Sequence, residues 1–135
     1  MNEKSNAHFI EEVTITRKIT SEDVMKFAAL SGDTNPLHIN EQFAKNTRFK
    51  QRVVHGAFLA SLFSQVVGIH LGTPNVLYIS QTCNFRLPVF IDETIQVHFK
   101  LKHYSNSTKI ATYVTEIIKE GQICVNGEAK VSELT

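Results

Sequence analysis

"GAFLASLFSQVVGIHL", residues 56–71, is the longest apolar stretch of the 135-residue chain and decides how the rest of the chain must fold. Its apolar residues cover nearly every face of a helix, so we predict a helix over about 56–70 that other structure encloses. Four polar residues interrupt the stretch, which is also shorter than the roughly 20 residues that span a bilayer. The chain must therefore supply a cover for a buried helix, and no membrane partner is expected.

Strand-like segments elsewhere in the chain can form this cover. They are 13–19, 76–89, 94–104, 109–119 and 122–134. Within the third of these, Ile95, Val97 and Phe99 alternate with polar residues, which is the period of a strand with one buried face and one wet face. Short connections predict that the last four segments form an antiparallel meander. We therefore predict a single α+β domain, residues 1–135, in which a curved antiparallel five-stranded sheet wraps around one long central helix.

The segment between the first strand and the apolar helix has helical spacing at both of its ends. "TSEDVMKFAALSGD" predicts a helix whose start is capped by Thr20 or Ser21 and which ends before Gly32. Asn35 precedes a proline, which disfavours helical backbone, so "DTNPLH" is predicted to be an extended or turning loop. Asn40 can cap a brief second helix over "EQFAKN".

Composition excludes several classes of partner. Fourteen basic and thirteen acidic residues give a formal net charge of +1, so no nucleic-acid partner is expected. The N-terminus lacks the basic start and apolar run of a secretory signal, which makes a cytoplasmic location the default. Cys83 and Cys124 lie in predicted strands and are expected to be reduced, buried thiols. No CxxC or HExxH pattern occurs, so neither a metal nor another cofactor is expected.

Two sequence blocks at a defined spacing resemble a known family. "FAALSGDTNPLHINEQFA" combines an aromatic residue, small residues, Gly-Asp-x-Asn-Pro-aliphatic-His and a later alanine, Ala44, and "VVHGAFLASLFS" follows after a short gap. Together they resemble the signature of the (R)-specific enoyl-CoA hydratases of the MaoC-like family, over nearly the whole chain. The resemblance implies a hot-dog fold. It also implies a hydro-lyase that adds water to a trans-2-enoyl-CoA and gives the (R)-3-hydroxyacyl-CoA.

The resemblance implies that Asp33 and His38 hold and activate the water. A carboxylate beside an imidazole can take a proton from the oxygen and deliver one to the α-carbon near neutral pH, and which of the two is the formal base stays open. Each residue alone would more simply be a turn aspartate or a solvated histidine, but the turn needs no imidazole. Asn35 either holds the loop or touches substrate, because Asn-Pro already favours a turn.

Gly56 stands at the start of the predicted apolar helix, where a backbone N–H lies at the positive end of the helix dipole. The resemblance implies that this amide is the oxyanion donor; the alternative is that Gly56 only permits a tight turn. Ser64 matches a supporting active-site serine of the family, although such a serine often bonds to a carbonyl one turn earlier. His55 is expected to be structural or adjacent to the substrate tunnel.

The resemblance implies an acyl-CoA thioester as substrate and a homodimer with sheets joined edge to edge, which would cover exposed strands. Arg48, Lys50 and Arg52 are expected either to meet phosphates of coenzyme A or of a carrier protein's pantetheine arm, or to form a solvated loop. Three other functions stay open. They are dehydration of a 3-hydroxyacyl-acyl-carrier-protein in fatty-acid synthesis, acyl-CoA binding without catalysis, and thioester hydrolysis.

Overall fold

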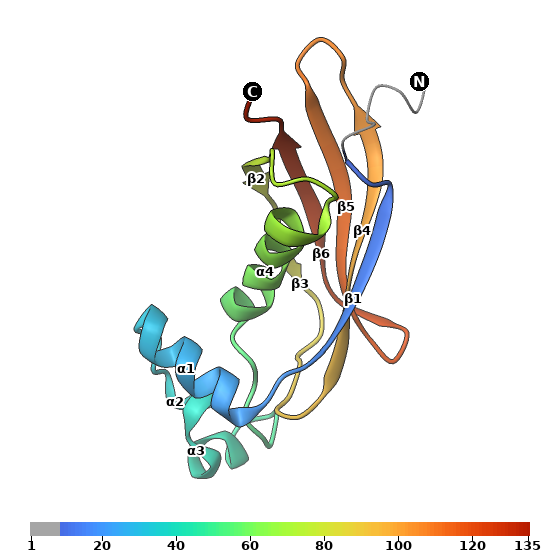
Figure 1. The fold of residues 1–135 in the computed structure, drawn as a ribbon. Helices are drawn as coiled ribbons and strands as arrows, with labels where there is room; N and C mark the ends of the chain where they lie inside the picture. The colour runs from blue at the N-terminus through green and yellow to red at the C-terminus, as the bar shows by residue number, and fades with distance from the viewer. Residues whose placement is uncertain (1–8) are drawn as a thin grey trace.

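The computed structural model describes residues 9–135 and shows an antiparallel sheet with its helices on one side (Figure 1). The strands are β1 (Glu12–Lys18), β2 (Leu77–Gln81), β3 (Asn84–Phe85), β4 (Thr94–Tyr104), β5 (Ile110–Lys119) and β6 (Gln122–Ser132). Their order in the sheet is β1-β4-β5-β6-β2, and β3 also pairs with β6. The predicted α+β architecture is confirmed, with six strands in place of the five expected.

The predicted central helix is confirmed, in two parts that lie along one face of the sheet (Figure 1). An α-helix, α4 (Gly56–Gln65), continues directly into one π-helical turn, η2 (Val66–His70). Its buried side chains are Phe58, Leu59, Leu62, Phe63, Val66 and Val67. Phe63 meets Phe99 of β4 edge-on, with ring centroids 5.8 Å apart. One face is less enclosed than we predicted, because Ala57, Ser61 and Ser64 are exposed.

The prediction of a single strand over 76–89 is wrong. β2 ends at Gln81, and β3 contributes only two paired residues before the chain leaves the sheet. The register shifts between Tyr78 and Ser80, and the Thr82 N–H then bonds to the Glu128 carbonyl, 2.9 Å away. The alternation of apolar and polar residues does not reveal such a break, because a bulge changes the backbone pairing and not the composition.

The prediction of one continuous meander is correct only for β4, β5 and β6, which follow one another in the sheet. β4 also pairs with β1, and β2 lies on the other side of β6. β2 and β4 are therefore separated by two strands in the sheet, although only the short β3 lies between them in the sequence. Short loops fix which strands form hairpins, whereas the place of β2 depends on long-range pairing.

The helical insert lies at the N-terminal end of α4, beyond one end of the sheet (Figure 1). It contains α1 (Ser21–Ser31), α2 (Pro36–Ile39) and α3 (Glu41–Lys45). Thr20 caps α1 through a reciprocal capping box with Asp23, and Asn40 caps α3, as the sequence predicted. The loop prediction for "DTNPLH" is wrong in its second half, since one helical turn begins at Pro36. Proline disfavours helix only for the residue before it and suits the first helical position itself.

Two other expectations concern the membrane and the cysteines. No helix within residues 9–135 is long and apolar enough to cross a bilayer. Cys83 and Cys124 are free thiols, and burial raises the pKa of both. Cys124 is buried in β6 as expected, but Cys83 is only partly buried and lies between β2 and β3, outside any strand.

Two glycines provide a matched test of the close approach between Thr82, just after β2, and Gly127 of β6. A Cβ added at Gly127 would lie 1.8 Å from the Thr82 carbonyl oxygen, whereas one added at Gly68 would meet nothing within 4 Å. Gly127→Ala is expected to lower the free energy of unfolding by about 1–3 kcal/mol, because the backbone of a neighbouring segment must move. Gly68→Ala should change it by less than about 1 kcal/mol. Urea titration measures both free energies, and equal stabilities of the two variants would contradict this account of the close approach.

Candidate active site

The loop after α1 places Asp33 beside a helix end. Gly32 has a φ of 82°, which ends α1 in the left-handed region that glycine tolerates. The Asp33 N–H then bonds to Ser31 Oγ, and Asp33 Oδ1 accepts from the Asn35 N–H at 3.2 Å. Asn35 Oδ1 accepts from the Leu37 N–H at 2.9 Å and so caps α2. In the described structure the Asn35 side-chain oxygen therefore holds the loop.

His38, on α2, is held by one short hydrogen bond. Its Nδ1 donates to the Val53 carbonyl oxygen at 2.6 Å, because a carbonyl can only accept. The side chain is 14% exposed, and Nε2 lies 3.9 Å from Asp33 Oδ2. When the ring is neutral, Nε2 carries the free lone pair. Nε2 of His38 and Oδ2 of Asp33 are then two hydrogen-bond acceptors that face each other. The structure thus brings the two residues of the predicted pair side by side.

His55 contacts both members of this pair, which the sequence did not indicate. The residue is 1% exposed, and its Nε2 donates to the Asp33 carbonyl oxygen at 3.0 Å. Its ring stacks on that of His38, with centroids 3.9 Å apart and planes inclined by 24°. Burial lowers the pKa of His55 and the charge of His38 lowers it further, while the Asp33 carbonyl and carboxylate oppose them. Burial therefore favours the neutral form of His55.

Asp33, His38 and His55 each place one potential metal ligand atom within 4.8 Å of the others. The ring nitrogens do not converge on one point, because stacked imidazoles direct their in-plane lone pairs side by side. His38 Nδ1 and His55 Nε2 also already donate to backbone carbonyls. The geometry suits proton transfer better than the tetrahedral coordination that a zinc ion prefers, so we keep the prediction that no metal is bound.

A cleft of 510 Å³ opens beside His38 and extends to the start of α4. His38 and Gly56 both line it, and most of the remaining wall is apolar, including Phe49, Leu59 and Phe85. Such a lining suits an apolar ligand that a few polar groups orient. The cleft therefore joins the imidazole of the pair to the helix start that the sequence singled out.

Gly56 is the first residue of α4, and its N–H has no hydrogen-bond acceptor within residues 9–135. Its φ is not positive, so no tight turn requires a glycine here. A Cβ would instead lie 2.9 Å from the ring of Phe85. Close approach of a neighbouring group explains the glycine better than the turn does, and it leaves a free donor at the helix end.

Ser64 is exposed on α4, and within the described chain it makes no hydrogen bond to Asp33 or His38. Ser61, one turn earlier, donates to the Phe58 carbonyl in the way expected of a helical serine. Within residues 9–135, therefore, no hydrogen bond connects Ser64 to the pair.

The three basic residues singled out in the sequence have different environments. Arg52 is 6% exposed and donates to the His38 carbonyl and to Ser21 Oγ, with Glu41 3.6 Å away. It holds the helical insert together and has few N–H groups left for a phosphate. Lys50 is exposed but does not line the cleft, whereas Arg48 does both, with its guanidinium 5.0 Å from the Phe49 ring centre.

Arg86 is a candidate that the sequence did not reveal. It is exposed, follows β3 and lines the same cleft as Arg48. It lies 38 positions after Arg48 in the chain, so no local run of charge connects the two. Only the fold brings both guanidinium groups to one cleft.

The neutral state of buried His55 predicts how stability depends on pH. Its pKa in the folded protein lies below that in the unfolded chain, about 6.5, so the unfolded chain takes up the proton first as the pH falls. Stability due to His55 is then complete above about pH 6.5 and declines below it. Urea unfolding at about pH 7.5 and about pH 5.5 should show that the wild type loses more stability than His55→Gln. His38 and Asp33, which face His55, are present in both proteins, and equal losses would contradict the assignment.

Comparison with known proteins agrees with the fold and the motif. Residues 5–122 match the model of the MaoC like domain. The (R)-specific enoyl-CoA hydratase of Rhodospirillum rubrum is 33% identical over 92% of this chain and 90% of its own. The 3-hydroxybutyryl-CoA dehydratase of Methylorubrum extorquens is 37% identical over 87% of this chain and 74% of its own.

A solved structure, that of the (R)-hydratase from A. caviae involved in PHA biosynthesis, superposes with a TM-score of 0.88. It is 35% identical in sequence, and the match covers 93% of this chain and 96% of that one. The resemblance stated from the sequence and the predicted hot-dog fold are both confirmed. The chain belongs to the MaoC-like domain family.

Proposed function

We propose that this chain hydrates a trans-2-enoyl-CoA to the (R)-3-hydroxyacyl-CoA, with Asp33 and His38 activating the water. The observation that carries the proposal is the 3.9 Å approach of His38 Nε2 to Asp33 Oδ2 beside an apolar cleft. The names of the Rhodospirillum rubrum and A. caviae relatives support the same reaction.

The separation of the pair suits one shared water. At 3.9 Å the two atoms are too far apart for a direct hydrogen bond, and both are acceptors while His38 is neutral. A water between them can donate one hydrogen to each, which turns its oxygen lone pairs toward the substrate. The oxygen then bonds to C3 of the enoyl thioester as the pair takes up one of its protons. The proton belongs to the pair, and we assign neither residue alone as the base.

The electrons of the C2=C3 double bond move toward the thioester carbonyl as the new C–O bond forms. The oxygen of that carbonyl becomes negative, and the free Gly56 N–H at the start of α4 can stabilise it. The proton taken from the water is then delivered to C2, so that the product contains the substrate plus one water. No covalent intermediate with the protein is needed.

The thioester's coenzyme A is proposed to leave the cleft past Arg48 and Arg86. Both are exposed guanidinium groups on the wall that also contains His38. Guanidinium groups bind phosphates through paired N–H donors, and the nucleotide end of coenzyme A carries three phosphates. Arg86 takes the place that the sequence gave to Arg52, which we assign to holding the insert instead.

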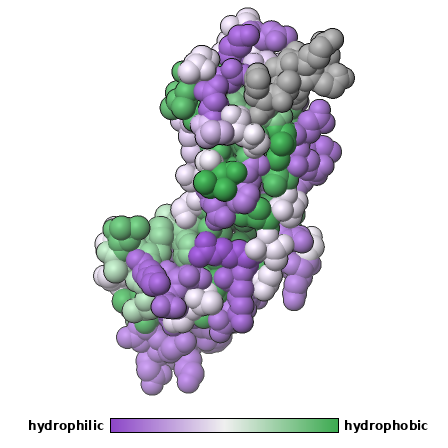
Figure 2. Space-filling view, in the orientation of Figure 1, coloured by the Kyte–Doolittle hydropathy of each residue, from purple (hydrophilic) through white to green (hydrophobic). Residues whose placement is uncertain are grey.

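A homodimer is part of the proposal. β2 is an edge strand of the sheet, and Leu77 and Ile79 on it are 50% and 45% exposed. Apolar side chains also lie at the surface over α1, where Leu30 is 87% exposed (Figure 2). Burying such groups between two copies is favourable and would cover the free edge.

Light scattering after size exclusion should give twice the mass of the chain.

Crotonyl-CoA tests the activity. The wild type is expected to remove the ultraviolet absorbance of the enoyl thioester and to form (R)-3-hydroxybutyryl-CoA, identified by chiral chromatography. Asp33→Asn keeps the shape but loses the carboxylate, and kcat/KM is expected to fall by about 10²- to 10⁴-fold. Loss of absorbance that is no faster with the wild type than with Asp33→Asn would reject the proposal. Release of free thiol would indicate hydrolysis.

Substrates with and without the nucleotide test the phosphate contacts. Arg86→Ala and Arg48→Ala are each expected to raise KM for crotonyl-CoA by about tenfold, because each removes one charged contact to phosphate. The same variants should leave KM for crotonyl-pantetheine, which has no phosphate, within about twofold. Lys50→Ala is the matched control and should change neither. An equal rise for both thioesters would show that the arginines act on the cleft itself.

A further inference from the structure

We propose that His55 is a positioning residue for the Asp33–His38 pair, because one buried imidazole fixes the backbone of the first and the ring of the second. The inference rests on the proposed function and adds a third residue to it. His55 would act through the other two and not on the substrate. Its side chain is only 1% exposed, whereas the Asp33 side chain is 50% exposed.

The two contacts of His55 constrain different motions. Face-to-face stacking at 3.9 Å sets the plane of the His38 ring, while the Nδ1 bond to Val53 sets the rotation within that plane. The 3.0 Å bond from His55 Nε2 to the Asp33 carbonyl anchors the loop that carries the carboxylate. Since both contacts come from one rigid ring, the spacing between Asp33 Oδ2 and His38 Nε2 is tied to it.

His55 is itself held by a run of rings that we call the aromatic stack: Phe58, Phe27, His55 and His38. Phe58 of α4 stacks on Phe27 of α1 with centroids 5.1 Å apart and planes 7° apart. Phe27 meets His55 at 4.9 Å and 59°. The stack therefore joins α4, α1 and α2, and the N-cap position of His55 places it between all three. Packing of this kind leaves the imidazole little freedom to turn.

Neither an apolar ring nor an amide would make both contacts. Phenylalanine can stack on His38 but has no N–H for the Asp33 carbonyl, and glutamine can donate but has no ring. Within residues 9–135 the His55 Nδ1 atom has no hydrogen-bond partner, so a proton added there would be buried without an acceptor. A neutral imidazole with its hydrogen on Nε2 meets every requirement of the position.

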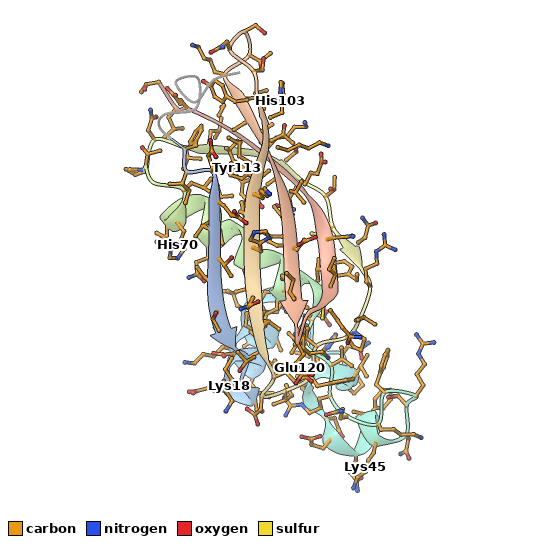
Figure 3. All side chains as sticks on the ribbon, turned by 90° about the vertical axis from the view of Figure 1, so that its right-hand side faces the viewer. Lys18, Lys45, His70, His103, Tyr113 and Glu120 are labelled. Carbon is orange, nitrogen blue, oxygen red and sulfur yellow. The ribbon has the colours of Figure 1, made fainter. Side chains whose placement is uncertain are left out.

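A series at position 55 separates the two contacts. His55→Phe keeps the stack, His55→Gln keeps the donor, and His55→Leu keeps neither. We expect kcat to fall by about tenfold in each of the first two and by about 100-fold in the third, with KM within about threefold, because misplaced groups slow the chemical step. His103→Gln is the control. It is exposed on β4, and Figure 3 shows it at the far end of the molecule from Lys45 of α3.

A second readout follows His38 directly. In ¹⁵N spectra the neutral His38 ring, assigned with His38→Gln, should show one protonated and one bare nitrogen in the wild type. The shifts should be averaged in His55→Leu, because without the stack the ring can turn away from Val53. A folded His55→Leu protein with wild-type kcat, or with His38 still showing one protonated and one bare nitrogen, would overturn the inference. If His55→Leu does not fold, the Phe and Gln variants decide it by the same two measurements. A wild type inactive on crotonyl-CoA would reject the proposed function, while the resonances would still test the positioning.

Discussion

The hydrogen bond from His38 Nδ1 to the Val53 carbonyl is the constraint on which the candidate site depends. At 2.6 Å it commits Nδ1 as a donor, which leaves Nε2 as the basic atom and directs it toward Asp33. With the opposite tautomer, Nε2 would carry the hydrogen and could not accept a proton from water. The Asp33–His38 motif can therefore take a proton from water only when Val53 holds His38 in this tautomer.

Several independent elements hold this arrangement. Val53 is bonded to Leu37 on one side and bridges to Phe90 on the other, and buried Arg52 ties the His38 carbonyl to α1. Residues 52–55 therefore hold α2 in place and also lead into the start of the apolar helix. Because that helix is buried against the sheet, its N-terminus and the free Gly56 N–H there are held in one position.

The sequence was sufficient for the parts that local chemistry decides. The apolar run predicted the central helix, and a cap at Thr20 or Ser21 and one at Asn40 predicted where α1 and α3 begin. The motif predicted that Asp33 and His38 meet. The sequence was insufficient for the features that depend on pairing between strands far apart in the chain. The place of β2 beside β6, the break after Gln81 and the approach of Arg86 to the cleft have no local signal, because each depends on which strands become neighbours. The role suggested for His55 was also hidden, since a stacked contact leaves no pattern in the sequence.

The central claim is that Asp33 and His38 act on one water as a unit. A double-mutant cycle on kcat/KM for crotonyl-CoA, with Asp33→Asn, His38→Gln and the double variant, tests it most directly. A unit predicts that the double variant is slower than either single variant by no more than about threefold, because the first substitution already removes the shared step. Losses that multiply in the double variant would show that the two residues act independently and would contradict the account.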